Sequence, residues 1–466
     1  MRENKAGGSS FPRLFAFVAA WSELLAAYAG FIGAVTGFCG ALERLFRPLW
    51  FDEVLTLNFA YLPDPAAICR AYVIPNNQIL HTVILHILHL RSGIPLPFLR
   101  FFPLVCGLLT LGLLYRGFRR ECGKLPLLTV LGAWAVSPPF LLYATALRGY
   151  MLAALLVTAA WLCGRKFAVS GKFAALAGWF GFALAALAVM PSALAGLAGA
   201  GLMILPLFGK YFWKKRRFYL LAAAVPAAFA LFYGPILPQL RGAFALKEGW
   251  RDPGAALLAL GIAAAATFNV LFVAVWPRRR KFRFRTLGYG MVWLLPLGGF
   301  LLPVAPFPRV WFVLFPIWAV LLARGLRHCR SLRRWWGVPV LIAAICGTLR
   351  GREALSPYCS LAGQDDFFAP YFLRREFAPY RTAAKLRELR PPMIYATLSA
   401  DPWSLLAAGP AVKFDSPRGR VPFLLPGAAV VLRRDEDPAE TEKRFGGRLI
   451  PVAPMGYQTV YQWRSE

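Results

Sequence analysis

The chain is poor in acidic residues. Its 466 residues include 22 Asp and Glu against 53 Lys and Arg, and only nine of those 22 precede residue 350. Charged residues make up 16% of the chain and hydrophobic residues 58%, whereas a soluble globular domain carries roughly 25% charged residues. This composition excludes a soluble enzyme and a disordered chain. It indicates an α-helical polytopic membrane protein with a small soluble part at its C-terminus.

Cysteine and histidine are also scarce. The eight cysteines are scattered without a CxxC pair, which argues against a zinc site and against a disulfide framework, and there are only four histidines. The net charge of +31 would suit a nucleic-acid-binding protein. Lys and Arg, however, fall in short clusters between apolar runs, as in the loops of membrane proteins. We therefore expect no nucleic-acid partner.

The apolar runs predict about 11 transmembrane helices. They lie near residues 14–42, 101–115, 125–144, 150–163, 173–190, 193–208, 218–233, 255–276, 287–304, 310–323 and 337–349. A cytoplasmic N-terminus places 26 basic residues but only two acidic ones, Glu3 and Glu121, on the inner side, as the positive-inside rule requires. The apolar stretch 77–90 is too short to cross and is expected to lie at the outer interface. The prediction is a multi-pass protein of the inner (cytoplasmic) membrane.

The pattern changes near residue 350. We expect a transmembrane domain over 1–349, with an outer loop at 43–99, and an extracytoplasmic α/β domain over 350–466. The elements expected in the second domain are helices at 380–389 and 403–408 and strands at 393–398, 428–432 and 459–463. No internal repeat is visible, which weakens the case for a transporter built from inverted repeats.

Two carboxylates stand side by side in the outer loop. Asp52 and Glu53 end the motif WFDE, just past the first apolar run. One interpretation is a helix start, in which Asp52 caps the helix and Glu53 interacts with the positive end of its dipole. The other is a general base at the membrane surface, because a carboxylate beside an apolar wall has a raised proton affinity. The two interpretations are compatible.

The segment 75–82 (PNNQILHT) brings several polar side chains to the mouth of the short apolar stretch. Asn76, Asn77, Gln78 and His81 could hydrogen-bond a sugar, or they could simply cap the helix that follows.

His86 and His89 are three residues apart and share a helix face. Two histidines are too few for a zinc site, so polar packing at the interface is the favoured interpretation. No metal site is predicted, although a divalent cation remains compatible with the sequence.

Three arginines fall at the outer membrane boundary, which the positive-inside rule leaves poor in Arg. Snorkelling would explain any one of Arg100, Arg148 and Arg309. Three at the same depth favour an anionic head-group site, because a guanidinium matches a phosphate bidentately. Lys247, in the outer loop 234–254, could join them.

In this order, the motifs resemble the polytopic glycosyltransferases of the C-type fold, most of all the protein O-mannosyltransferase and lipid A aminoarabinose transferase group. WFDE stands where that family has its Asp-Glu motif, and the segment 75–82 resembles an Asn-Asn-His-containing stretch of bacterial members. The segments 99–102, 137–150 and 308–326 are similar to later signatures. The resemblance covers about residues 14–349, with Gln78 in place of the usual His.

The resemblance implies that a polyprenyl-phosphate sugar is the donor and that its sugar passes, with inversion, to a hydroxyl of a glycan, lipid or protein acceptor at the outer face. Asp52 and Glu53 would be the catalytic residues. The donor phosphate would be bound by Arg100, Arg148, Arg309 and Lys247. The sugar or the acceptor would be bound by Asn76, Asn77, Gln78, His81, Tyr143 and Tyr150.

The alternative function is a membrane transporter or lipid flippase. Such a protein would place charges near the bilayer midplane, where Glu23 is the only carboxylate candidate of this sequence. A non-catalytic scaffold would need neither the Asp52–Glu53 pair nor the arginines. The concentration of polar residues at one boundary favours an enzyme that works from one side.

Overall fold

The computed structural model describes most of the chain. The described residues are 51–60, 62, 64–70, 77–208, 216–238, 308–328, 379–396, 412–414, 421–433, 436–455 and 458–465, with isolated positions before residue 46 and between 291 and 296.

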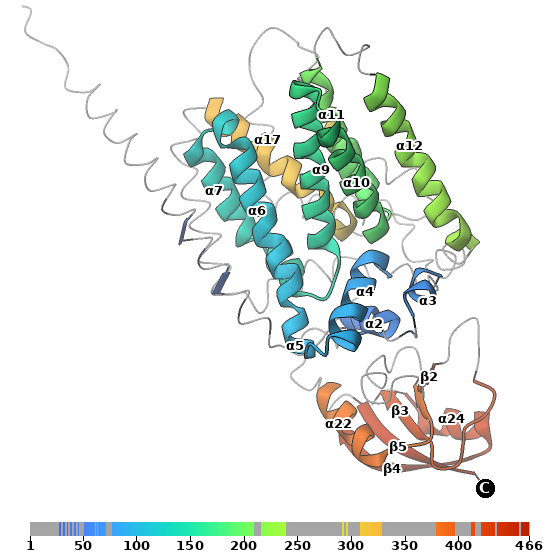
Figure 1. Cartoon of the computed structure of the whole chain (residues 1–466). Helices are drawn as coiled ribbons and strands as arrows, with labels where there is room; N and C mark the ends of the chain where they lie inside the picture. Colours follow the sequence, from blue (N-terminus) through green and yellow to red (C-terminus); the bar gives the residue numbers. More distant parts are fainter. Residues whose placement is uncertain are drawn as a thin grey trace, which may run out of the picture.

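The described helices form a bundle with a group of short helices at one end, and a small sheet lies beyond that end (Figure 1). The bundle consists of α6 (Phe101–Cys122), α7 (Lys124–Ala135), α8 (Pro138–Thr145), α9 (Tyr150–Ser170), α10 (Phe173–Val189), α11 (Ala193–Ile204), η2 (Leu205–Leu207), α12 (Arg216–Tyr233), η4 (Gly234–Ile236), η7 (Pro308–Leu314) and α17 (Phe315–His328). The short helices are α2 (Phe51–Ala60), α3 (Pro65–Arg70), α4 (Ile79–His86), η1 (Ile87–Arg91) and α5 (Leu96–Leu99).

Four described helices are long and apolar enough to cross a membrane. They are Phe101–Cys122, Tyr150–Ser170, Arg216–Ile236 and Val310–Arg327. At 1.5 Å per residue, a helix of the length of α6 reaches about 33 Å, which exceeds the ~30 Å of the hydrocarbon layer. The protein is therefore mostly helical, with several apolar helices, as predicted. The expected spans at 255–276 and 337–349, and most of those at 14–42 and 287–304, lie outside the described residues, so the total of about 11 spans stays a prediction.

Two spans continue about two turns beyond their predicted ends. α6 was expected to end at residue 115 and α9 at residue 163, but they end at Cys122 and Ser170. The basic residues of these turns are good helix formers, so the change to polar sequence does not stop the helix. Each helix stops at a glycine with positive φ, Gly123 at 82° and Gly171 at 68°, where a residue without Cβ is favoured.

The expected span 125–144 is broken into α7 and α8, which meet at an angle of 67°. Pro138 and Pro139 open α8, and because proline has no N–H, α7 cannot continue through them. Instead Ser137 turns back, donating its N–H and its hydroxyl to the carbonyl of Trp134 at 3.0 and 2.6 Å. The break allows the chain to reverse within a few residues and begin α9 at Tyr150.

The bundle core is packed tightly around α9. Phe118 of α6 and Trp161 of α9 have ring centroids 4.3 Å apart. A Cβ at Gly164 of α9 would lie 2.5 Å from Ile204 and 2.9 Å from Trp179. Small residues at such contacts let helices approach closely, which is the usual source of helix association in membranes.

The end of α6, the end of α9 and the start of α12 lie at the end of the bundle farthest from the short helices (Figure 1), and these segments are rich in Lys and Arg. The described basic residues of this end are Arg116, Arg119, Arg120, Lys124, Arg165, Lys166, Lys172, Arg216, Arg217, Arg324 and Arg327. Among them lies one described carboxylate, Glu121, which pairs with Arg165 of α9 and Arg324 of α17. We call these three residues the basic-end clasp, because they join α6, α9 and α17.

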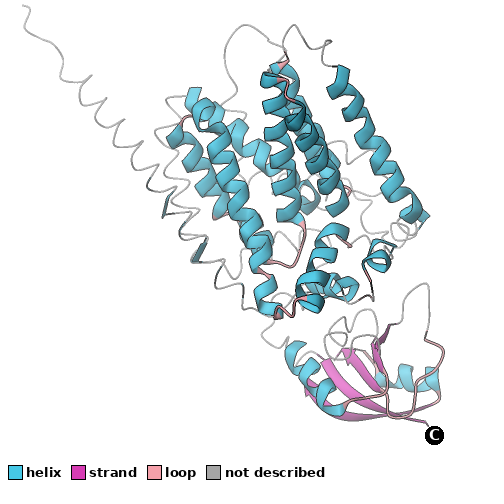
Figure 2. Ribbon diagram, viewed as in Figure 1, coloured by secondary structure: helices cyan, strands magenta, loops and turns pink. Residues whose placement is uncertain are grey.

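The C-terminal part contains a five-stranded sheet in the order β2-β1-β3-β5-β4 (Figure 2). The strands are β1 (Ile394–Ala396), β2 (Val412–Phe414), β3 (Ala429–Arg433), β4 (Gly447–Met455) and β5 (Gln458–Ser465), and the helices are α22 (Pro379–Leu389) and α24 (Pro438–Phe445). β1 is parallel to β2 and β3, whereas β5 is antiparallel to β3 and β4.

Four of these elements, α22, β1, β3 and β5, coincide with the helix and strands expected from the sequence. The expected helix at 403–408 lies outside the described residues. The domain boundary near residue 350 does too, and the position of the sheet outside a membrane stays a prediction.

Candidate active site

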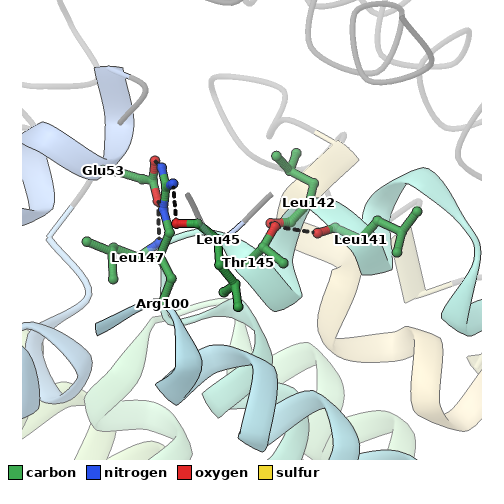
Figure 3. A network of polar contacts seen from close by, with 7 residues as sticks. All are labelled: Leu45, Glu53, Arg100, Leu141, Leu142, Thr145 and Leu147. Atoms are coloured by element: carbon green, nitrogen blue, oxygen red, sulfur yellow. Dashed lines mark hydrogen bonds and ion pairs between the residues drawn. The ribbon is translucent and has the colours of Figure 1, made fainter. Parts of the chain in front are cut away.

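Glu53 of α2 lies in a buried polar network at the short-helix end of the bundle (Figure 3). Its Oε1 accepts the Nε–H of Arg100 at 2.9 Å and the backbone N–H of Leu147 at 2.7 Å. Its Oε2 accepts from Nη2 of Arg100 at 2.5 Å. Glu53 is 0% exposed and Arg100 is 4% exposed. The ion pair is therefore bidentate and shielded from water, the strong form of this interaction.

Arg100 connects three parts of the chain. It lies between α5 and α6, so its guanidinium sits at the start of a spanning helix. In addition to its two bonds to Glu53, it donates from Nη1 to the carbonyl of Leu45 at 3.1 Å (Figure 3). The arginine thus joins residues ahead of α2, α2 itself and the first turn of α6.

The turn between α8 and α9 is held against this network. Ala146, Leu147 and Arg148 are all buried. The N–H of Leu147 bonds to Glu53, the N–H of Arg148 bonds back to the carbonyl of Ala146 at 2.6 Å, and the N–H of Gly149 bonds to Oε1 of Gln78. Three consecutive backbone donors are therefore satisfied in a buried segment that belongs to no helix.

The side chain of Arg148 extends from this turn toward α2. Its Nη1 donates to Oγ1 of Thr56 at 3.0 Å, and its Cζ lies 5.6 Å from the ring centroid of Tyr150. The residue is 2% exposed. Arg148 and Arg100 therefore both reach the same helix, α2.

The polar residues ahead of α4 make contacts within the protein. Asn77 donates from Nδ2 to the carbonyl of Ile68 at 2.9 Å and accepts from the hydroxyl of Thr82 at 3.0 Å. Gln78 accepts from Gly149. The segment therefore docks the start of α4 onto α3 and onto the α8–α9 turn.

His81 is different, because neither of its ring nitrogens has a hydrogen-bond partner in the described part of the chain. It is fully buried in α4, outside the four spanning helices, with its ring centroid 5.8 Å from that of Phe102. Burial, followed by the positive charge of Arg148, lowers the pKa of His81 from 6.5 to about 3. The imidazole is therefore neutral at physiological pH.

Tyr143 and Tyr150 face each other across the same turn. Their ring centroids are 4.3 Å apart, and Phe312 of η7 lies 5.0 Å from Tyr143. Both tyrosines are buried. The aromatic group thus forms an apolar wall next to Arg148.

Other predicted site residues are described in part or not at all. Asp52 directly precedes Glu53 in α2, and Arg309 lies in η7 three residues before Phe312, but the side chains of both are outside the described atoms. Asn76 and Lys247 are outside the described residues. The structure therefore brings together Glu53, Arg100, Arg148, Asn77, Gln78, His81, Tyr143 and Tyr150 at one end of the bundle.

Sequence reasoning missed three contributors to the network. Thr56 follows Glu53 by three residues and so shares its helix face, a spacing that could have identified it. The backbone N–H groups of Leu147 and Gly149 carry no signature in the sequence.

A metal-binding cluster is not found among the described residues, where no group of three His, Cys, Asp or Glu side chains comes together. His86 and His89 each use Nδ1 for a backbone carbonyl, that of Ala60 at 2.8 Å and that of Ile94 at 2.7 Å. These contacts agree with polar packing for the two histidines.

No protein family and no curated protein matches the sequence. Two crystal structures of ArnT from Cupriavidus metallidurans match it in fold, one in the apo state and one bound to undecaprenyl phosphate. Both align with a TM-score of 0.57, over 95% of this chain and 98% of theirs, at 14% and 15% identity respectively. An Archaeoglobus fulgidus oligosaccharyltransferase, in complex with Zn and sulfate, aligns with a TM-score of 0.40 and 12% identity, over 95% of this chain and 73% of that chain.

The likeness to ArnT extends over nearly the whole of both chains, so it includes the helical bundle and the C-terminal part. The chain therefore has the polytopic C-type glycosyltransferase fold of ArnT, the fold that its sequence motifs resemble.

Proposed function

We propose that this protein transfers a sugar from a polyprenyl-phosphate donor to an acceptor hydroxyl at the outer face of the membrane. The observation that carries the proposal is the buried cluster of Glu53, Arg100 and Arg148 at one end of a bundle with the ArnT fold. One of the matching ArnT structures holds undecaprenyl phosphate. A lipid phosphate needs a cation where the apolar bundle ends, and Arg148 is our candidate for that cation.

The two carboxylates of the WFDE motif have separate roles in this proposal. Glu53 accepts three N–H groups, and protonating it would weaken all three bonds. It is therefore suited to hold Arg100 and the α8–α9 turn, and unsuited to shuttle a proton. Asp52, the neighbouring residue in α2, is our candidate for the general base.

The donor phosphate is assigned first to Arg148, with Arg309 and Lys247 as further candidates. Arg100, whose Nε, Nη1 and Nη2 bond Glu53 and Leu45, would act on the phosphate mainly by fixing this arrangement. A preorganised cation stabilises the charge that develops on a leaving group without reorganisation cost.

In the proposed reaction, the acceptor oxygen attacks the anomeric carbon as Asp52 takes its proton. The bond between that carbon and the phosphate oxygen breaks, and polyprenyl phosphate leaves with the electron pair. Attack opposite the leaving group inverts the anomeric configuration. A carboxylate nearby also suits the oxocarbenium character of glycosyl transfer. Of the residues predicted to bind the sugar or the acceptor, the structure describes Asn77, Gln78, His81, Tyr143 and Tyr150.

A transporter or flippase fits the described charges less well. In the four described helices that could span a membrane, the charged residues lie in the first or last turns, near the basic end. A transport pathway would place ionisable groups near the midplane.

A membrane-vesicle assay with radiolabelled polyprenyl-phosphate sugars tests the proposal. We expect one label to leave its lipid and appear in an acceptor glycan, lipid or protein. A label that crosses the membrane while still attached to its lipid would indicate a flippase instead.

A further inference from the structure

Gln78 makes an unusual contact for a residue that was expected to bind sugar. Its Oε1 accepts the backbone N–H of Gly149, 71 residues later in the chain. Gln78 is 4% exposed and precedes α4 directly. Its acceptor is therefore committed to the turn that carries Arg148.

The same turn is held on its other side by Glu53, which accepts the N–H of Leu147, 94 residues away. Arg148 thus stands between two backbone donors, each bound to a buried side chain of the first outer loop. A third hold comes from Thr56, which accepts from the guanidinium itself. Contacts from α2 and from the start of α4 therefore fix both the backbone and the guanidinium of Arg148.

Packing closes the turn further at Gly149. A Cβ at this position would lie 2.6 Å from Cγ1 of Val189 and 3.0 Å from Cβ of His81. The φ of Gly149 is −73°, so it is space and not backbone strain that requires glycine here. The turn cannot shift toward α4 or α10 without a clash.

We infer that Gln78 is a positioning residue which, together with Glu53, clamps the backbone on both sides of Arg148 and presets its guanidinium for the phosphate of a polyprenyl-phosphate donor. The inference rests on the proposed function, and it gives Gln78 a role on the phosphate side of the donor, not the sugar side. Rigid placement of a cation matters because a preset group loses little entropy when the anion arrives.

Undecaprenyl phosphate without a sugar is the probe that separates these roles. Gln78→Met keeps the side-chain length but removes the acceptor. We expect it to weaken binding of this lipid by about 10-fold, the effect of one buried hydrogen bond. A residue that contacts only the sugar would leave this affinity unchanged.

The second readout is dependence on Arg148. In an Arg148→Met background, Gln78→Met should cause no further loss of lipid affinity, because the clamp acts through the arginine. Gln78→Asn, whose amide is one methylene too short to reach Gly149, should give a similar loss that also vanishes in this background. Gln78→Asn replaces Gln78→Met in this test if the Met variant does not fold.

Thr82→Val is the matched control. Thr82 is buried one turn further along α4. Its hydroxyl donates to Oδ1 of Asn77 and to the backbone carbonyl of Gln78, and not to the turn that carries Arg148. The variant should lower the melting temperature and keep the affinity for undecaprenyl phosphate.

Additive losses in the double variant, or an unchanged affinity in Gln78→Met, would overturn the inference and leave the proposed function in place. A wild-type protein that binds no undecaprenyl phosphate and releases no label from any donor would overturn the proposed function, and the inference with it.

Discussion

At the residue scale, the buried pair of Glu53 and Arg100 decides how the site holds together. Burying both charges costs desolvation energy that their attraction only partly repays, so the pair as a whole adds little net stability. Removing one partner alone destabilises the fold, because the other charge then stays buried without compensation.

Glu53→Gln should therefore destabilise the protein by roughly 3–5 kcal/mol, measured by thermal or denaturant unfolding in detergent. Arg100→Met alone should be similarly damaging, and the double variant should be less unstable than the sum of the two. Purely additive losses would show that the two side chains do not interact as described.

Asp52→Asn tests the proposed base. Asp52 is the second residue of α2 and not the N-cap expected from the sequence. Asn keeps its shape and loses only the interaction of the charge with the helix dipole, about 0.3–1 kcal/mol, so stability should be largely kept while the transfer rate falls by roughly 10²–10⁴. Asp64→Asn is a matched control, since Asp64 caps α3 by accepting from Ala67 at 2.7 Å, away from the cluster. Near-normal turnover in Asp52→Asn, with normal protein levels, would remove Asp52 from catalysis.

His81 makes stability depend on pH. Its pKa is lowered to about 3 in the folded protein, so between pH 6.5 and pH 3 the unfolded chain binds a proton that the folded chain does not. The buried neutral ring therefore does not lower the free energy of unfolding above about pH 6.5, and it lowers that free energy progressively as the pH falls. At pH 5 the loss relative to pH 7.5 should be about 2 kcal/mol. His81→Gln should lose less between these pH values, as read from melting temperatures; an equal loss would contradict the assignment.

At the scale of elements, the junction of α8 and α9 controls the site. The proline pair breaks the expected span, and the turn that follows the short α8 bonds Glu53 of α2 and Gln78 ahead of α4. The turn at 146–149 then fits only because Gly149 has no side chain against Val189 and His81.

Gly149→Ala should therefore displace this turn, lowering both the melting temperature and turnover. Adding Val189→Ala removes the nearest clashing group and should recover part of both. Wild-type turnover in the single variant would show that the turn has room that the structure does not give it.

Much at this scale follows from the sequence, and the exceptions have physical reasons. Hydropathy locates the spanning helices, because membrane burial needs continuous apolar length. The strand β4 escapes prediction because Pro451 and Pro454 interrupt its pattern, and it tolerates them as an edge strand. The helix α24 had readable signals in Asp437 as N-cap and Gly446 as its left-handed end.

For the site, the side chains that meet at α2 were expected, but their pairing was not. Arg100 was expected to face a phosphate, and in the structure it bonds Glu53, 47 residues away. Spacing along the chain gives no information on such long-range pairing. The backbone donors of Leu147 and Gly149 are invisible for the same reason.

At the scale of the whole molecule, charge is segregated between two ends. The described basic residues of the spanning helices gather at one end, while the Glu53 cluster lies at the other, on the side of the sheet (Figure 1). The positive-inside rule then predicts that the basic end lies in the cytoplasm and the cluster outside.

Cysteine labelling tests this orientation. Lys172, in the turn before α10, and Glu440, in α24, are both exposed. In intact cells, an impermeant thiol reagent should modify Glu440→Cys but not Lys172→Cys, judged against the unsubstituted protein. The reverse pattern would invert the topology and move the proposed site to the inner face.

The basic-end clasp has a consequence for biogenesis. Glu121 and its partner Arg324 are 203 residues apart, whereas Arg165 follows Glu121 closely in the chain. During synthesis, α6 and α9 can meet early, but the clasp is complete only after α17 has been made. The span containing α17 is the most buried of the four. The helices made earlier therefore lack the surface that packs against it until this span is inserted. The order of translation thus leaves this bundle unfinished until a late helix is inserted.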